Sequence, residues 1–384
     1  MQYRAIGKTG VSASIIGLGA EYLDEKPYDL VEETLHAAID NGINIIDVFM
    51  PGEEVRKNIG KALAGRRDKV ILQGHICSTD TNQQYDISRD LSTVKKYFEN
   101  LLRFLDTDYI DFGMLFFIDS EHDYQGAFES PILEYALGLK EKGVIRHLGA
   151  SSHVAATAKK VIETNLVDLL MFSINPAFDL VPPNAAVQST ENGKDAPAPI
   201  GKYVMDPERA QLYHLCESRG VGITVMKTLA SGKLLSPLHT PFARPLTVGQ
   251  CIHYALTRPA VASSLVGCES REQVEETVGY LRLTDAERDY APAIGSIKED
   301  FKGKCVYCRH CLPCPSGIDI ARVHRNLDAA VIDEKNIPPK IIRHYKALKH
   351  YGSDCVSCGS CETRCPFGVP VIRNMARAAE LFGR

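Results

Sequence analysis

The sequence predicts an α/β fold in which a closed (β/α)8 barrel is followed by a small, mainly helical domain. The length of 384 residues suits a barrel of about 250 residues with an additional domain. Over residues 1–297, short apolar runs rich in β-branched residues alternate with longer amphipathic stretches. Eight of the 12 cysteines lie between Cys305 and Cys365, and this change of composition marks a second domain over residues 298–384.

The barrel prediction rests on eight strand–helix units in strict alternation. The strands are expected over residues 15–19, 43–48, 70–76, 109–116, 145–150, 169–174, 222–226 and 262–266. The helices are expected over residues 31–41, 53–64, 91–105, 132–142, 155–164, 207–219, 248–256 and 271–280. Such alternation implies parallel strands with helical crossovers, and eight units favour a closed barrel over an open doubly wound sheet.

Charge and hydropathy exclude several classes of protein. The net charge of −4 gives no support to nucleic-acid binding, and no apolar run approaches the roughly 18 residues of a membrane span. MQYRAIGKTG at the N-terminus has no apolar stretch typical of a secretory signal, so we expect a cytoplasmic protein. Residues 298–384 carry 15 Lys and Arg against 9 Asp and Glu, a net charge of +6, while residues 1–297 carry 29 against 39, a net charge of −10.

One connection, residues 175–205, is unusually long. It contains five prolines and a polar stretch over residues 188–194. Because it follows the sixth predicted strand, we expect it at the C-terminal mouth of the barrel, where active sites of this fold are built. A functional, mobile loop and a disordered insertion without a role are both open.

The predicted second domain carries two similar cysteine motifs. Residues 305–315 read CVYCRHCLPCP, and residues 355–366 read CVSCGSCETRCP. The second is the bacterial ferredoxin run C-x2-C-x2-C-x3-C-P, and the first is one residue shorter before its last cysteine. In such a run three cysteines hold one cluster and the fourth, followed by proline, reaches the other cluster. The sequence therefore predicts two [4Fe–4S] clusters, one on Cys305, Cys308, Cys311 and Cys365, the other on Cys355, Cys358, Cys361 and Cys314.

Other interpretations of these cysteines are weaker. Disulfides are rare in a protein without an export signal, and two zinc knuckles would leave the trailing Cys-Pro pairs unexplained. The 41 residues from Cys314 to Cys355 have room for helices over residues 318–331 and 339–351, which resembles α-helical ferredoxin modules. Of the solitary cysteines, Cys216 and Cys251 are expected to be buried structural thiols, and Cys268 could be a reactive thiol at the mouth.

Several strings in residues 1–285 resemble the aldo-keto reductase family. They are IIGLGA, GINIIDV, EEVRKNIGKALAGRRDKVIL, LRFLDTDYIDFGML, LKEKGVIRHLGASSH and VMKTLASG. The ASSH string and the cysteine-bearing tail together resemble the subgroup with a C-terminal ferredoxin-type domain. The resemblance implies a barrel with a catalytic tetrad of Asp, Tyr, Lys and His and a nicotinamide cofactor.

Only one tetrad position matches that resemblance. Asp47 corresponds to the aspartate, but DVFMPGEEV contains no tyrosine. The lysine position falls at His75 (or Gly74), and the histidine position falls at Phe116. A general acid must donate a proton to the developing oxyanion, which phenylalanine cannot do. Tyr22 or His75 could replace the missing acid; the alternative for each is a residue that only lines the mouth.

The resemblance also implies cofactor contacts. These would involve Ser151, Ser152, Asn175, Lys227 and Arg271. Arg271 is the only cation in VGCESREQVEET, which also holds four glutamates, and the glutamine expected at the sixth strand falls near Met171. A 2′-phosphate beside four carboxylates needs more than one guanidinium, which argues against tight NADPH binding. Weak NAD(H) binding and another ligand are both open.

Three functions follow. The first is an iron–sulfur oxidoreductase that transfers electrons between [4Fe–4S] clusters and a small molecule at the barrel mouth, with ferredoxin or flavodoxin as a partner. The second is an NAD(P)H-dependent carbonyl reductase that uses Tyr22 or His75 as its acid, with structural clusters. The third is a non-catalytic redox sensor or electron-transfer subunit.

Overall fold

The computed structural model describes residues 1–82, 84–181, 204–294, 303, 305, 311–331, 334–337, 339–365 and 368–384. The chain divides into two compact units. The first, which we call the barrel unit, comprises Met1–Thr79 and Ile87–Glu299. The second, the C-terminal unit, comprises Asp300–Arg384 together with Asp80–Asp86, a segment that the sequence analysis did not connect with it.

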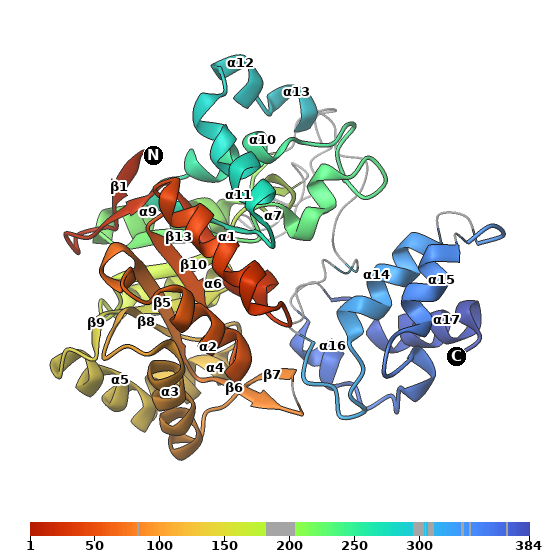
Figure 1. The fold of residues 1–384 in the computed structure, drawn as a ribbon, viewed down its shortest axis with the longest axis horizontal. Helices are drawn as coiled ribbons and strands as arrows, with labels where there is room; N and C mark the ends of the chain where they lie inside the picture. The colour runs from red at the N-terminus through yellow and green to blue at the C-terminus, as the bar shows by residue number, and fades with distance from the viewer. Residues whose placement is uncertain are drawn as a thin grey trace, which may run out of the picture. The chain divides into compact units, whose positions relative to one another are not determined.

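Eight parallel strands close into a barrel, which confirms the predicted fold class (Figure 1). In chain order they are β3 (Ile16–Gly19), β4 (Ile45–Val48), β5 (Ile71–Ile76), β8 (Ile110–Leu115), β9 (Ile145–Ser152), β10 (Leu169–Ser173), β13 (Gly222–Met226) and β14 (Val261–Gly267). The last strand pairs with the first, with Leu265 opposite Gly17. Each strand lies within a few residues of its predicted position, because fully buried parallel strands are continuous apolar runs.

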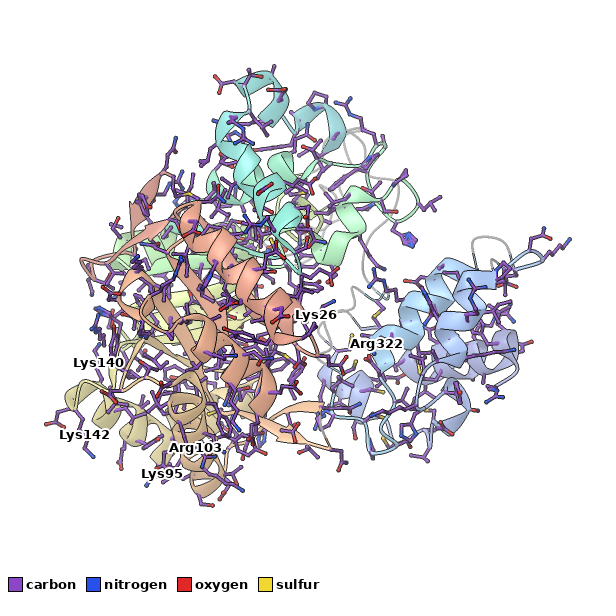
Figure 2. The ribbon with its side chains drawn as sticks, viewed as in Figure 1. Lys26, Lys95, Arg103, Lys140, Lys142 and Arg322 are labelled. Atoms are coloured by element: carbon purple, nitrogen blue, oxygen red, sulfur yellow. The ribbon has the colours of Figure 1, made fainter. Side chains whose placement is uncertain are left out.

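Amphipathic helices alternate with these strands. They are α1 (Tyr28–Asp40), α2 (Glu53–Ala62), α3 (Leu91–Leu105), α5 (Pro131–Glu141), α6 (Ala155–Glu163), α9 (Pro207–Arg219), α10 (Val248–Leu256) and α11 (Arg271–Val278). In α3 the Asp90 side chain caps the first turn by accepting the Thr93 N–H, and the apolar stripe is buried. Lys95 and Arg103 project from the exposed face of the same helix (Figure 2).

Several short elements were not predicted. They include the hairpin β1 (Tyr3–Ala5) and β2 (Ser12–Ser14), the hairpin β6 (Ser78–Thr81) and β7 (Gln84–Ile87), α4 (Glu121–Phe128), α12 (Asp285–Arg288) and α13 (Ala291–Ile294). The long connection begins with α7 (Pro176–Asp179), and β11 (Leu180–Val181) pairs with β12 (Val204–Met205). The predicted polar stretch over residues 188–194 lies outside the described residues.

The C-terminal unit is helical. Its helices are α14 (Ile320–Ala330), α15 (Pro339–Lys346), α16 (Ser360–Arg364) and α17 (Val371–Phe382), with a 3-10 turn η5 (Gly352–Asp354). The helix predicted over residues 339–351 ends at Lys346, because the chain must turn into the second cysteine motif. The core includes Tyr345 and Met375 as well as Cys311 and Cys361, and Tyr345 stacks on Phe382 with 4.1 Å between ring centroids.

No helix in the described part of the chain is long and apolar enough to cross a bilayer.

Candidate functional site

Three polar side chains from neighbouring strands meet inside the barrel. Asp47 on β4 lies opposite Gln73 on β5, and His75 follows two residues later on the same inward-facing side. His75 Nε2 lies 2.8 Å from Asp47 Oδ1, and Gln73 Nε2 donates to the same oxygen over 2.9 Å. All three residues are at most 2% exposed. A buried carboxylate therefore orients an imidazole whose Nδ1 has no hydrogen-bond partner among the described residues.

Gly74 and His75 were both candidates for the lysine position, and the strand separates them. A Cβ on Gly74 would lie 2.7 Å from Leu101 Cδ2 of α3, so this position faces the outer helices. His75 faces inward beside two aromatic rings. Its ring centroid is 5.1 Å from that of Phe116 and 6.1 Å from that of Phe49. These rings shield the Asp47–His75 pair from water.

Tyr22 lies elsewhere at the mouth. It belongs to the 3-10 turn η1 (Ala20–Leu23) after β3, is 39% exposed, and packs on Gly267 at the end of β14. On the same turn, Glu21 forms an ion pair with Lys227, with 3.6 Å between Oε2 and Nζ. Lys227 follows β13, so this pair links two strand ends.

The side chains of Ser151, Ser152 and Asn175 form hydrogen bonds with other residues of the chain. Ser151 Oγ accepts the Phe117 N–H over 2.9 Å. Asn175 is fully buried; its Nδ2 donates to the Lys227 carbonyl over 2.8 Å, and its Oδ1 accepts two N–H groups at the start of α7. The Asn175 amide thus uses its oxygen and one of its two N–H bonds within the fold, and the Ser151 hydroxyl accepts a backbone hydrogen bond.

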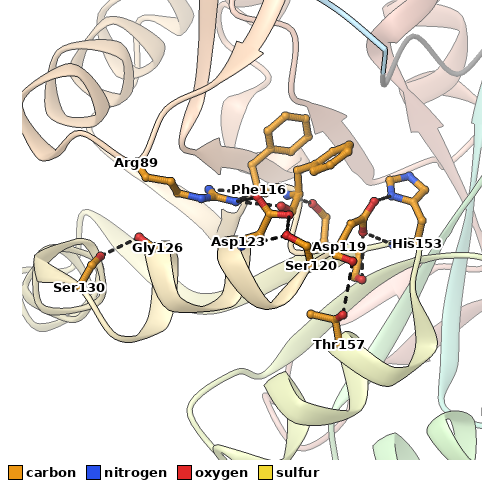
Figure 3. A network of polar contacts seen from close by, with 12 residues as sticks. Arg89, Phe116, Asp119, Ser120, Asp123, Gly126, Ser130, His153 and Thr157 are labelled. Atoms are coloured by element: carbon orange, nitrogen blue, oxygen red, sulfur yellow. Dashed lines mark hydrogen bonds and ion pairs between the residues drawn. The ribbon is translucent and has the colours of Figure 1, made fainter. Parts of the chain in front are cut away.

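A further polar network at the ends of β8 and β9 escaped the sequence analysis (Figure 3). Asp119 accepts from the His153 N–H over 2.7 Å, contacts His153 Nδ1 at 2.9 Å, and accepts from Ser152 Oγ over 3.1 Å. Arg89 donates to the Phe116 and Phe117 carbonyls and pairs with Asp123. The network fixes the loop that carries Phe116. Its members Ser152 and His153 had a signal in the sequence, as parts of ASSH, but Asp119 and Arg89 had none.

The predicted phosphate-binding cation is engaged by carboxylates. Arg271 Nε donates to Glu33 over 3.0 Å, and its Nη1 lies 3.9 Å from Glu275. The hydrogen bond to Glu33 raises the pKa of Arg271. Lys26, two residues before α1 and labelled in Figure 2, forms an ion pair with Glu269, with 2.7 Å between Nζ and Oε2. Both cations of this region are therefore neutralised by side chains of the chain itself.

Four cysteines of the C-terminal unit line one cavity. They are Cys314, Cys355, Cys358 and Cys361, which is the set predicted for the second cluster. Apolar side chains, among them Ile318, Ile320 and Met375, complete the walls. Soft thiolates around an apolar cavity fit an iron–sulfur cluster. Cys358 is exposed and its pKa is lowered by the Ser360 N–H and hydroxyl, whereas burial raises the pKa of Cys361 to about 11.

The other predicted ligand set is described in part. Cys311 is buried in the core of the C-terminal unit, and Cys305 and Cys365 pack against that core. Cys308 lies outside the described residues. In the described residues, no group of three or more His, Cys, Asp or Glu is arranged to hold a single metal ion. The ligand assignment of both clusters therefore stays a prediction.

The solitary cysteines are buried. Burial raises the pKa of Cys216 to about 12 and that of Cys268 to about 11, and it raises the pKa of Cys77 and Cys251 as well. Cys268 is 2% exposed, with its Sγ 3.6 Å from Thr277 Oγ1. A buried thiol with a raised pKa is a poor nucleophile, so the geometry gives no support to a reactive Cys268.

Comparison with known proteins agrees with this architecture. Residues 15–242 match the model of the Aldo/keto reductase family, and residues 304–370 match a 4Fe-4S dicluster domain. The chain belongs to the aldo/keto reductase family. It is an oxidoreductase of that family with an additional 4Fe–4S dicluster domain.

Curated relatives are distant. Aldo-keto reductase YhdN of Bacillus subtilis (strain 168) is 33% identical over 167 residues, which cover 40% of this chain and 47% of that protein. The uncharacterized oxidoreductase YqkF of the same strain is 25% identical over 307 residues, covering 75% of this chain and 94% of that protein. L-galactose dehydrogenase of Arabidopsis thaliana is 25% identical over 308 residues, covering 72% and 87%.

Solved structures share the fold. The holo form of aldo-keto reductase AKR11C1 from Bacillus halodurans has a TM-score of 0.59 at 22% identity, over 78% of this chain and all of that chain. An aldo/keto reductase from Klebsiella pneumoniae, in complex with NADP and acetate, has a TM-score of 0.54 at 18% identity, over 78% of this chain and 98% of that chain. At this level of identity the likeness concerns the barrel fold alone.

Proposed function

We propose that this protein is an iron–sulfur oxidoreductase that passes electrons between two [4Fe–4S] clusters of its C-terminal unit and a small molecule bound at the barrel mouth. The observation that carries the proposal is the cavity lined by Cys314, Cys355, Cys358 and Cys361. When bound there, a cluster supplies electrons one at a time. Hydride transfer from a nicotinamide to a carbonyl has no need of such a group.

The barrel contributes proton chemistry to this reaction. With Asp47 accepting from Nε2–H of His75 at 2.8 Å, the imidazole Nδ1 accepts a proton when neutral and donates one when charged. Phe49 and Phe116 keep water from the pair. His75 can therefore deliver or remove the proton that accompanies electron transfer, while the tetrad positions of tyrosine, lysine and histidine are lost.

The electrons would come from, or go to, an external carrier. The C-terminal residues 298–384 have a net charge of +6, before the charge of the clusters is counted. Ferredoxins and flavodoxins are acidic, so complementary charge favours their encounter with this surface. Cys358 is exposed and the neighbouring Val356 is 67% exposed, which leaves one side of the cysteine cavity open to a partner.

An NAD(P)H-dependent carbonyl reductase is the second candidate. Family membership favours it, together with Ser151 at the end of β9. The pairing of Arg271 with Glu33 weighs against a site for the 2′-phosphate of NADPH. His75 would then be the acid, since the ring of Tyr22 packs against Gly267 at the end of β14.

Anaerobic reduction experiments separate these candidates. The full chain, purified without air, is mixed with dithionite or with NADPH, and the cluster absorbance and NADPH oxidation are followed with a panel of aldehydes. We expect dithionite, but not NADPH, to bleach the clusters. Oxidation of NADPH by aldehydes would support the carbonyl reductase, and silence towards every donor and acceptor would support a sensor or subunit.

A further inference from the structure

The hairpin β6–β7 has no role in the functions considered so far. It is inserted directly after β5, the strand that carries His75, and its segment Asp80–Asp86 belongs to the C-terminal unit. The chain therefore enters the C-terminal unit twice, once through this hairpin and once at Asp300. We propose that the hairpin completes the cluster-binding unit, and that Gln84 is a positioning residue for Cys314.

Gln84 clamps the turn that carries Cys314. Its Oε1 accepts the Cys314 N–H over 2.9 Å, and its Nε2 donates to the carbonyls of Gly317 and Ile318 over 3.3 and 3.4 Å. The turn itself is closed by the Gly317 N–H, which donates to the Cys314 carbonyl over 2.9 Å. One side-chain amide thus binds both ends of the turn, through its acceptor and its donor.

The left-handed backbone of Gly317, with φ of +70°, makes such a clamp useful. A turn that ends on a glycine in this conformation has many accessible states when it is not held. Without Gln84, three polar backbone groups of this turn would lose a hydrogen-bond partner. Because a cluster ligand must meet its iron in one orientation, ordering the backbone of Cys314 lowers the cost of binding.

A second contact joins the hairpin to both cysteine motifs. Arg364 lies between Cys361 and Cys365, and its Nη2 is 3.7 Å from Asp86 Oδ1. Its Nη1 donates to the carbonyl of Pro313, the residue before Cys314, over 3.1 Å. The hairpin therefore touches the end of the first motif through Gln84 and the end of the second through Asp86.

The turn that carries Cys314, a predicted ligand of the second cluster, is therefore held in place by a hairpin from a distant part of the sequence. Gln84 is nine residues after His75 and 230 residues before Cys314. The inference rests on the proposed function, because it takes Cys314 as a ligand. It adds that a change in the hairpin alters the cluster without altering any cysteine.

The test compares Gln84→Ala with Gln125→Ala in the full chain, purified without air. Gln125 is an exposed glutamine on α4 that only donates to Glu121 on the same helix over 3.3 Å. Iron per chain, the EPR spectrum of the dithionite-reduced protein, and amide exchange of peptides over residues 312–320 are measured. For Gln84→Ala we expect a changed signal of one cluster and about tenfold faster exchange in this peptide, as loss of a hydrogen bond allows. Gln125→Ala should match the wild type.

A conservative variant keeps the test decisive if Gln84→Ala misfolds. Gln84→Glu retains an oxygen for the Cys314 N–H but loses the donor to Gly317 and Ile318. We expect its EPR signal to lie closer to the wild type than that of Gln84→Ala. An unchanged spectrum and unchanged exchange in both variants, in a protein that holds its clusters, would overturn the role of Gln84. A wild-type protein without clusters would instead overturn the proposed function.

Discussion

The two units of this protein differ in whether the residues of the candidate site form part of the hydrophobic core. In the barrel unit, the interior is filled by side chains such as Phe112, Met114 and Leu169, and the polar group Asp47, Gln73 and His75 lies among them. In the C-terminal unit, the predicted ligands Cys311 and Cys361 are themselves core residues. We therefore expect the barrel to fold without its polar group, and the C-terminal unit to depend on its clusters in order to fold.

We expect the largest difference between the two units after removal of the clusters. We expect treatment with an iron chelator and a mild oxidant to abolish amide protection in α14 and α17, because ligand binding and folding are coupled in small metal domains. Protection of α3 and α5 in the barrel unit should remain. Hydrogen exchange of the full chain before and after treatment measures both. Equal loss of protection in the two units would contradict the comparison.

Replacement of the buried imidazole tests the barrel alone. His75→Ala should lower turnover by about a hundredfold or more, which is the usual contribution of a positioned general acid. Turnover is measured with reduced methyl viologen and the aldehyde or ketone that the wild type reduces fastest. Iron content should stay unchanged. The matched control is His122→Ala, which alters an exposed histidine on α4. Wild-type turnover in His75→Ala would show that His75 only lines the barrel mouth and has no catalytic role.

The smallest expected effect is a twofold decrease in the iron content per chain on replacement of one predicted ligand. Cys311→Ser should lose the first cluster and retain the second, so iron falls from about eight to about four per chain. Cys216→Ala, which alters a buried thiol of α9 outside both motifs, should keep the full amount. Full iron in Cys311→Ser would refute the ligand assignment of the first cluster.

Much of the fold was predictable because the barrel strands are continuous apolar runs with helical stripes between them. The strands around Asp47 and His75 were found in this way, and so were α3 and α14. The β6–β7 hairpin was not, since its strands are four residues long and polar, and its partner Cys314 lies far away in sequence. Asp119 and Arg89 were missed for the same reason: their contacts join loops that have no periodic pattern.

Only some residues of the candidate site could be predicted from the sequence. Spacing indicated the set Cys314, Cys355, Cys358 and Cys361, because the fourth cysteine of each run is expected to serve the other cluster. No sequence pattern showed that Asn175 binds the Lys227 carbonyl, or that Arg271 is paired with Glu33. Such pairing depends on which helices and strand ends the closure of the barrel brings together.

The most direct test of the account is an iron and sulfide determination with EPR spectroscopy on the full chain, isolated without air. We expect brown protein with about eight iron and eight sulfide per chain, and EPR signals of reduced [4Fe–4S] clusters after dithionite. Colourless protein that holds zinc alone would contradict it.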